Sequence, residues 1–258
     1  MLPGEIDAKP FRHCKYIRMR KIILFVLAMT VSTGLLAQKT INGPNAEVRE
    51  VGVFHSIKIS GGIHLLLTQA EEQAVAVSAA ARDDRERIRT VVEDGVLKIS
   101  FQVKGEHGRR GKVARKLRAY VSVKELRSLR AAGGALVEID GELKANAISI
   151  AASSGAIVNG KINADNIEVD QSSGAIVNIA GFADNMKVDG SSGSKFCGFD
   201  LAVNNCYAET NSGAAVEVTV NKELTATATS GGAVRYKGDA KLRKLKTNSG
   251  GSVRKQKS

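Results

Sequence analysis

The sequence contains no tryptophan, and aromatic side chains make up only 4% of its 258 residues. Carbohydrate clefts and nucleic-acid platforms both rely on stacking aromatic rings. Their scarcity argues against either kind of site, and we expect no nucleic-acid partner.

The motifs of common enzyme and metal sites are also missing. The sequence has no Gly-x-Ser-x-Gly elbow and no phosphate-binding loop. No Cys or His pair has metal-ligand spacing, and we expect His55, His64 and His107 to face solvent. We therefore predict no enzyme activity, no catalytic residue, no metal and no cofactor.

A long apolar run is absent too. The apolar stretch from Ile22 to Ala37 follows a basic segment and is short for a membrane span. This pattern predicts a signal peptide over 19–37, with a retained anchor as the alternative. Residues 1–18 are interpreted as an over-extended gene start, because Met19 is followed by Arg-Lys. The residue directly after Ala37 is Gln38 and not cysteine, which argues against a lipoprotein anchor.

Positive charge dominates the remaining chain. The net charge of +12 becomes +8 after residues 1–37 are removed, since six basic and two acidic residues leave with them. Such a balance allows binding to anionic polymers or membrane surfaces. We place the protein in the periplasm, on the outer-membrane surface or outside the cell.

A phrase of Ser-Gly or Gly-Gly followed by a small residue recurs seven times in the second half of the chain. A regular interval of this kind indicates a repeat architecture. Successive second glycines are separated by 21, 19, 19, 20, 19 and 19 residues. We predict that these glycines form tight corners: Gly134, Gly155, Gly174, Gly193, Gly213, Gly232 and Gly251.

Between the glycines, apolar and polar residues alternate, as in Ile167-Glu168-Val169. Alternation is typical of strands with one buried face, and Asn, Asp, Ser and Gly mark turns between them. About 19 residues with three short strands and three turns match one coil of a parallel β-helix. The predicted fold is all-β, with a right-handed parallel β-helix of 19–20 residues per coil over 131–253.

Two ladders of side chains are expected inside this solenoid. The small residues after each glycine form the first, namely Ala135, Ala156, Ala175, Ser194, Ala214, Ala233 and Ser252. The second is Val137, Val158, Val177, Phe196 and Val216. Arg235 interrupts the second ladder, and we expect the solenoid to end or fray there. A polar last coil protects an exposed edge.

The segment 51–130 is rich in strands but lacks the glycine period. We assign it to an N-terminal β region of the same domain, preceded by a linker over 38–50. Residues 54–60 and 63–68 read as two strands about the Gly61-Gly62 turn. Residues 88–92 and 96–101 read as a hairpin with an Asp-Gly turn.

Two basic segments, the loop Lys104–Lys116 and the tail Lys237–Lys257, are the candidate binding sites, and two solvated segments without a ligand are the alternative. Their expected ligands are anionic glycans, lipopolysaccharide phosphates, or an envelope or host surface protein. The candidate residues are Lys104, Arg109, Arg110, Lys112, Arg115, Lys116, Arg254 and Lys255.

A β-helical lyase or hydrolase acting on an acidic polysaccharide is the enzymatic alternative. Such enzymes cluster carboxylates on one face. The candidates are Asp165, Asp170, Asp184, Asp189 and Glu209, interleaved with Asn166, Asn185 and Asn204. One carboxylate per corner fits turn chemistry better than a cleft. Cys197 and Cys206 form either a disulfide or two buried thiols.

Several segments, taken together in their order along the chain, resemble a bacterial family of exported proteins of unknown function, the putative auto-transporter adhesin, head GIN domain family. The matching stretches are Val53–Ile57, Gly61–Ile63, Val91–Ile99, Tyr120–Val123, Leu126–Leu129 and the Ser-Gly-Ala repeats. The resemblance covers about 51–253 and implies an exported all-β protein with β-helical coils. The Lys104–Lys116 loop is longer and more charged than the family pattern. We therefore expect a non-enzymatic adhesin-like or scaffolding protein, although a fold alone carries no function.

Overall fold

The computed structural model describes residues 46–103 and 115–256, and strands account for nearly all of this part of the chain. The predictions for 1–18, for the signal peptide 19–37 and for most of the linker 38–50 lie outside the described residues. So do Lys104, Arg109, Arg110 and Lys112 of the basic loop, and His107.

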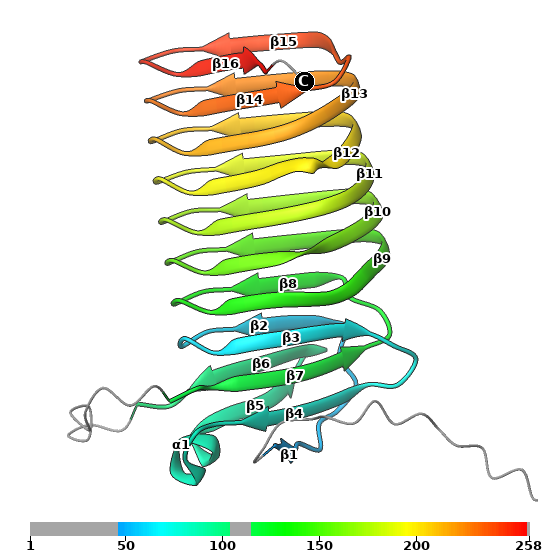
Figure 1. Cartoon of the computed structure of the whole chain (residues 1–258), viewed down its shortest axis with the longest axis vertical. Helices are drawn as coiled ribbons and strands as arrows, with labels where there is room; N and C mark the ends of the chain where they lie inside the picture. Colours follow the sequence, from blue (N-terminus) through cyan, green and yellow to red (C-terminus); the bar gives the residue numbers. More distant parts are fainter. Residues whose placement is uncertain (1–45, 104–114, 257–258) are drawn as a thin grey trace, which may run out of the picture. The chain divides into compact units, whose positions relative to one another are not determined.

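The repeat region is a right-handed parallel β-helix, as predicted (Figure 1). Five long strands lie one above another, and each pairs with the next in parallel register. Ile157 lies opposite Ile176, for example, and Val169 lies opposite Val188. The strands are β9 (Leu136–Ala152), β10 (Ile157–Gln171), β11 (Ile176–Gly190), β12 (Lys195–Thr210) and β13 (Ala215–Ala228).

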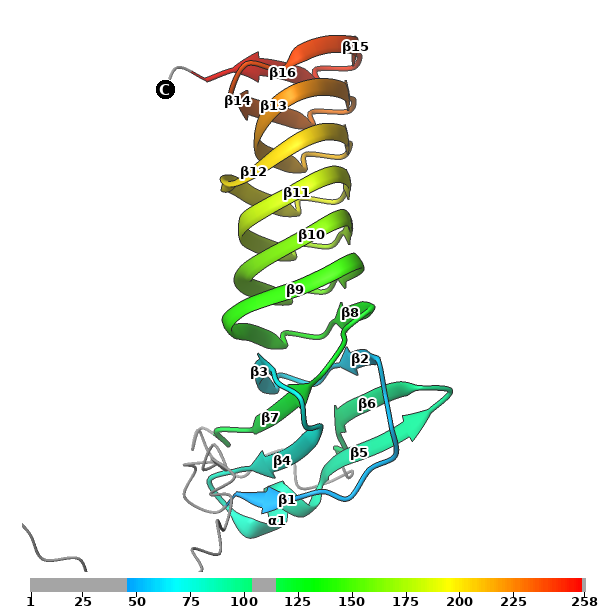
Figure 2. The same ribbon diagram turned by 90° about the vertical axis from the view of Figure 1, so that its right-hand side faces the viewer.

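The prediction of three strands and three turns per coil is wrong. From β9 to β13, each coil is one strand that runs from one corner to the next and bends midway, as Figure 2 shows. The register shifts near the bend in the pairs β9–β10, β11–β12 and β12–β13. Between β10 and β11 only the residue at the outside of the bend, Asp165, leaves the register. The backbone groups on both sides stay hydrogen-bonded, which satisfies donors and acceptors that a separate loop would expose.

The Ser-Gly corners are two-residue turns of type I′. Ser154 and Gly155 have φ values of +52° and +70°, and the Ala156 N–H donates to the Ser153 carbonyl at 3.1 Å. The Gly155 N–H donates to the Ser173 carbonyl of the next turn at 3.1 Å. Stacking therefore hydrogen-bonds every corner to its neighbour, which offsets the strain of a serine in the left-handed region.

The last two corners lie one residue earlier than predicted. Ser230-Gly231 and Ser249-Gly250 have the positive φ values, and the Gly231 N–H donates to the Ser249 carbonyl at 3.1 Å. Gly232 and Gly251 instead take the inward position held by alanine or serine in lower coils. A Cβ on Gly232 would lie 2.8 Å from the Thr210 backbone carbonyl carbon. An alanine at position 232 would therefore clash with this backbone. In Ser230-Gly231-Gly232 the first glycine forms the corner, one residue before the predicted position.

Because of this shift, the predicted membership of the two interior ladders is wrong in the last two coils. Ala233 lies opposite Ala215, and Ser252 lies opposite Ala233, so both belong to the next column. The first ladder ends at Ala214. The second ladder continues through Val234, which is fully buried. Arg235 lies in the neighbouring outward column opposite Glu217, so it interrupts nothing.

The solenoid therefore does not end or fray at Arg235. It continues through β14 (Ala233–Lys237), β15 (Lys241–Thr247) and β16 (Ser252–Lys255). β15 pairs in parallel with the second half of β13, and β16 pairs with β14. We call β15, the turn at Ser249-Gly250 and β16 the terminal coil (241–256).

The N-terminal region belongs to the same 16-stranded sheet. The Gly61-Gly62 turn lies under the first repeat corner, since the Gly62 N–H donates to the Gly133 carbonyl at 3.0 Å. Its flanking strands do not pair with each other. β2 (Ser56–Ile59) pairs with β6 (Val96–Phe101) and β8 (Ser128–Ala131), whereas β3 (His64–Gln69) pairs with β7 (Arg118–Val123) and β9.

Antiparallel strands extend the sheet beyond these parallel coils. β5 (Ile88–Glu93) and β6 form the predicted hairpin, with Asp94 and Gly95 in the left-handed region of its turn. β4 (Ala74–Ser78) pairs with β7, and β1 (Glu47–Val48) pairs with β4. A short helix that the sequence did not predict, α1 (Arg82–Glu86), connects β4 to β5.

Candidate interaction surface

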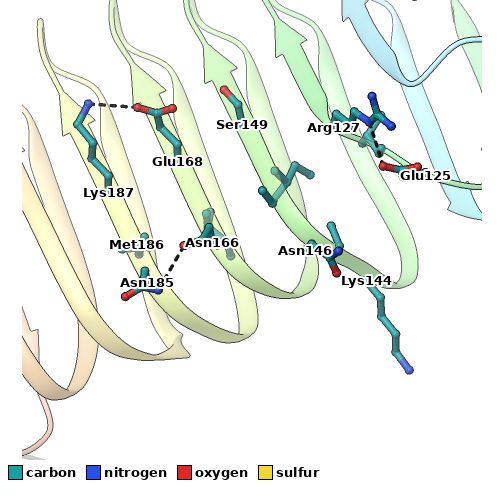
Figure 3. A pocket seen from close by; sticks show the side chains of 15 residues that line it. Glu125, Arg127, Lys144, Asn146, Ser149, Asn166, Glu168, Asn185, Met186 and Lys187 are labelled. Atoms are coloured by element: carbon teal, nitrogen blue, oxygen red, sulfur yellow. Dashed lines mark hydrogen bonds and ion pairs between the residues drawn. The ribbon is translucent and has the colours of Figure 1, made fainter.

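A shallow groove follows the bends of β9, β10 and β11 (Figure 3). Its volume is about 720 Å³, and apolar side chains form its floor: Leu126, Ala145, Ala147, Ile148, Ile167 and Met186. A ladder of asparagines crosses it. Asn185 Nδ2 donates to Asn166 Oδ1 at 3.2 Å, and Asn205 Nδ2 donates to Asn185 Oδ1 at 3.1 Å. The ladder offers amide donors and acceptors in an extended row.

Ion pairs occupy the rim of this groove. Lys187 Nζ lies 3.1 Å from Glu168 Oε1 and 3.0 Å from Asp189 Oδ2, and these hydrogen bonds raise the lysine pKa. Arg127 Nε lies 2.9 Å from Glu125 Oε1 and lowers the pKa of that carboxyl. Most charges on this wall are therefore matched within the protein.

The carboxylates named for the enzymatic alternative divide into two groups. Asp170, Asp189 and Glu209 lie opposite one another on consecutive strands, near a shallow hollow beside the turns. Burial, followed by the charges of Glu168 and Asp189, raises the pKa of Asp170. Asp189 contacts Lys187, and Glu209 accepts a hydrogen bond from the Tyr207 hydroxyl at 3.0 Å.

Asp165 and Asp184 lie instead at the outside of the bends. Asp184 Oδ1 accepts a hydrogen bond from Asn204 Nδ2 of the next coil at 2.7 Å, so this carboxylate belongs to a side-chain ladder between coils and not to a local turn. Within 46–103 and 115–256, no group of three or more His, Cys, Asp or Glu side chains could hold a metal ion.

The predicted basic residues that are described lie at opposite ends of the strand order. Arg115 Nε lies 3.8 Å from Asp84 Oδ1, and its guanidinium lies 5.1 Å from the centre of the Phe101 ring. Lys116 follows it with a φ of +46°. A carboxylate and an aromatic ring thus already engage the cation of Arg115.

Arg254 and Lys255 lie on the terminal coil, together with the other cations of the basic tail between residues 241 and 246. All seven residues of β15 are exposed, including Lys241, Arg243, Lys244 and Lys246. Arg243 contacts Glu223, and Lys255 Nζ lies 3.8 Å from Asp239 Oδ1. Among described residues, Lys244, Lys246 and Arg254 have no ion-pair partner. The alternating basic run 241–246 was the signal for this surface.

The described histidines, His55 and His64, and the described cysteines, Cys197 and Cys206, lie within the strand-rich part of the fold. His64 Nε2 lies 2.6 Å from Glu138 Oε2, and His55 Nδ1 lies 3.1 Å from Ser56 Oγ. Cys197 and Cys206 are free thiols, and complete burial raises the pKa of Cys206 to about 12. A thiol with so high a pKa is protonated and unreactive at neutral pH.

The sequence matches the family described as "Putative auto-transporter adhesin, head GIN domain" over residues 53–240. The chain belongs to this head GIN domain family. No curated protein matches the sequence. The family description contains a suggested role in adhesion and no enzymatic activity.

Solved structures share the fold of this head GIN domain chain. A putative adhesin from Bacteroides fragilis is 15% identical, with a TM-score of 0.73, covering 82% of this chain and 96% of its own. A putative adhesin from Parabacteroides merdae is 19% identical, with a TM-score of 0.63 and coverages of 83% and 96%. A putative lipid binding protein from Parabacteroides distasonis is 21% identical, with a TM-score of 0.64 and coverages of 84% and 98%.

The described part of the chain contains no helix that is long and apolar enough to cross a membrane.

Proposed function

We propose that this head GIN domain protein is a non-enzymatic, adhesin-like protein, exported by the predicted signal peptide, that binds anionic surface polymers through its terminal coil. The terminal coil has six lysine or arginine side chains and no carboxylate. Arg243 and Lys255 contact Glu223 and Asp239, which lie outside the coil, whereas Lys244, Lys246 and Arg254 have no ion-pair partner among the described residues. This excess of cations carries the proposal, because unpaired positive charge attracts polyanions.

The side walls, by which we mean the outward faces of β9–β14, differ from the terminal coil. On these faces, cations of one coil contact carboxylates of the neighbouring coil: Lys161 lies 2.9 Å from Glu142, and Arg235 lies 3.0 Å from Glu217. Surface pairs of this kind add little stability, but they neutralise the wall. A polyanion therefore gains more by contacting the terminal coil than by contacting the walls.

Binding of the full chain to immobilised dextran sulfate, at low and at high salt, tests the proposal. The triple variant Lys244→Ala/Lys246→Ala/Arg254→Ala should lose most of the low-salt binding. The matched control Lys161→Ala/Lys187→Ala/Lys195→Ala removes the same charge from the walls and should bind like the unmodified protein. If both variants lost the same amount of dextran sulfate binding, the binding would depend on net charge alone, which would contradict a binding site on the terminal coil.

The predicted loop residues Arg109 and Arg110 have a separate variant, Arg109→Ala/Arg110→Ala. A loss of binding in this variant, with the terminal-coil variant unaffected, would move the site to the loop.

The polysaccharide lyase or hydrolase remains the second candidate, favoured by the aligned carboxylates and the raised pKa of Asp170. Release of reducing or unsaturated ends from polygalacturonate, lost in Asp170→Asn, would support it. The shallow setting of these carboxylates favours the binding protein.

A further inference from the structure

Two leucines on the terminal coil are exposed although their columns belong to the core. Leu242 lies opposite Leu224, and Leu245 lies opposite Ala226. Leu224 and Ala226 are fully buried, whereas Leu242 and Leu245 are 42% and 48% exposed. Lower members of the same columns, such as Met186 and Val188, are also buried. The apolar interior thus reaches the surface at this end of the stack. Figure 1 shows this end, where β15 and β16 form the last coil.

Cations surround these leucines in sequence and in space. β15 alternates between the two kinds of residue, with Arg243, Lys244 and Lys246 beside the leucines. Arg254 and Lys255 lie on β16 of the same coil. Asp239, which contacts Lys255, precedes the coil and is fully exposed. Large apolar side chains within a cationic rim make up the combination by which proteins bind the surface of anionic bilayers.

Other occupants fit this surface less well. A soluble polyanion neutralises the lysines but leaves both leucines in water. A second copy of the same end brings like charges together, and lysines on an edge strand oppose strand pairing between copies. An anionic lipid surface satisfies both features, because headgroup phosphates meet the cations while the leucines enter the upper acyl layer.

We propose that the terminal coil is a peripheral docking site for an anionic lipid surface. This inference rests on the proposed function, since both use the same cations, and it adds the partner that the leucines select. The unpaired backbone groups of β15 and β16 cannot enter hydrocarbon without large cost. The coil therefore stays at headgroup depth, with Leu242 and Leu245 as its only anchors on β15.

Co-sedimentation of the full chain with vesicles tests this site. One set of vesicles contains phosphatidylcholine alone, and the other contains added phosphatidylglycerol; dextran sulfate binding is measured in parallel. The unmodified protein should sediment only with the anionic vesicles. The variant Leu242→Ser/Leu245→Ser should lose vesicle affinity by at least about tenfold while keeping its dextran sulfate binding.

Two further variants complete the design. Lys244→Ala/Lys246→Ala/Arg254→Ala should lose both kinds of binding. Val48→Ser/Val53→Ser removes exposed apolar residues from the N-terminal region, where they are 69% and 85% exposed, and should keep both. Thermal melting of each variant checks that it is folded.

The outcomes separate the two proposals. Dextran sulfate binding without vesicle binding, or an unchanged vesicle affinity in the leucine variant, overturns the lipid site and leaves the polyanion function standing. Absence of both kinds of binding overturns both, and the lysines then serve only to protect the edge. A dimer in light scattering that the leucine variant abolishes also overturns the lipid site, in favour of a second copy.

Discussion

The first and last coils of this protein finish the same parallel stack in different ways. At the N-terminal side, antiparallel strands β1, β4 and β5 extend the sheet, and Leu65, Leu97 and Val77 are fully buried. At the C-terminal side, the sheet ends with parallel strands β15 and β16, whose apolar residues are partly exposed. At the N-terminal end, further strands pair with the parallel coils. At the C-terminal end, the last coil is exposed and carries many cations.

This difference illustrates two ways in which a parallel stack can finish: with added antiparallel strands, or with a last coil that carries many cations. A row of lysines discourages strand addition, and it costs little because the side chains remain in water. The same lysines make up the proposed binding surface. The predictions below therefore contrast the terminal coil with the N-terminal end and the interior coils.

The largest expected effect contrasts one leucine from each end. Leu65→Ala removes a fully buried side chain and should lower the free energy of unfolding by about 2–5 kcal/mol. Leu245→Ala removes a half-exposed one and should cost less than about 1 kcal/mol. Urea denaturation measures both values. Similar losses would mean that the terminal coil is covered in solution.

The corner glycines provide a second contrast, between conformation and space. Gly155→Ala places a Cβ in open space but at a φ of +70°, for a cost of about 1–2 kcal/mol. Gly232→Ala meets the Thr210 backbone and should cost about 1–3 kcal/mol. Hydrogen exchange distinguishes the mechanisms: Gly232→Ala should expose amides of β14, whereas Gly155→Ala should leave them protected.

The asparagine ladder tests the middle of the stack. Asn185→Ala removes two side-chain hydrogen bonds within the groove and should lower stability by about 1 kcal/mol. Asn178→Ala breaks one such bond, to Asn159 at 2.6 Å, outside the groove and should cost about half as much. Thermal melting compares the two. A larger loss of stability for Asn178→Ala than for Asn185→Ala would contradict the expectation that the two hydrogen bonds of Asn185 stabilise the stack.

The smallest effect concerns the pH dependence of Asp170. Its pKa is raised in the folded protein, so the folded state holds this proton to a higher pH than the unfolded chain. Stability from this site therefore falls as pH rises through the raised pKa and is fully present below the unfolded value. Asp170→Asn should stabilise by less than about 0.5 kcal/mol at neutral pH.

That gain should vanish at a pH below the ordinary aspartate value of about 3.9, as followed by melting across pH. Asp165→Asn, at the outside of a bend, serves as the control. A gain for Asp170→Asn that persists in acid would exclude charge repulsion as its cause.

The fold was predictable because its signals are local and repeated. The glycine period marked the corners, and alternation such as Ile167-Glu168-Val169 marked the buried face. Polar–apolar periodicity also located the β5–β6 hairpin, whose Asp-Gly turn is a short-range signal. These features depend on residues that are close in sequence, so they can be predicted without knowledge of the tertiary structure.

Features set by contacts between coils were not predictable. The slip at Gly231 arises because the Thr210 backbone leaves no room for a side chain at Gly232. The strands about Gly61-Gly62 look like a hairpin, yet each finds a parallel partner more than 30 residues away. Alternation does not specify partners, so register emerges only when the coils stack.

The sequence by itself determined the repeated β-coil, its buried columns and the basic composition of residues 241–246, because propensity, turn chemistry and charge are properties of the residues. Only the tertiary structure decided that the column of Leu224 ends at an exposed Leu242, and that Lys244 and Lys246 have no carboxylate to meet. The reason is physical: burial and ion pairing depend on what the neighbouring coil supplies, and above the terminal coil the described chain supplies no further strand.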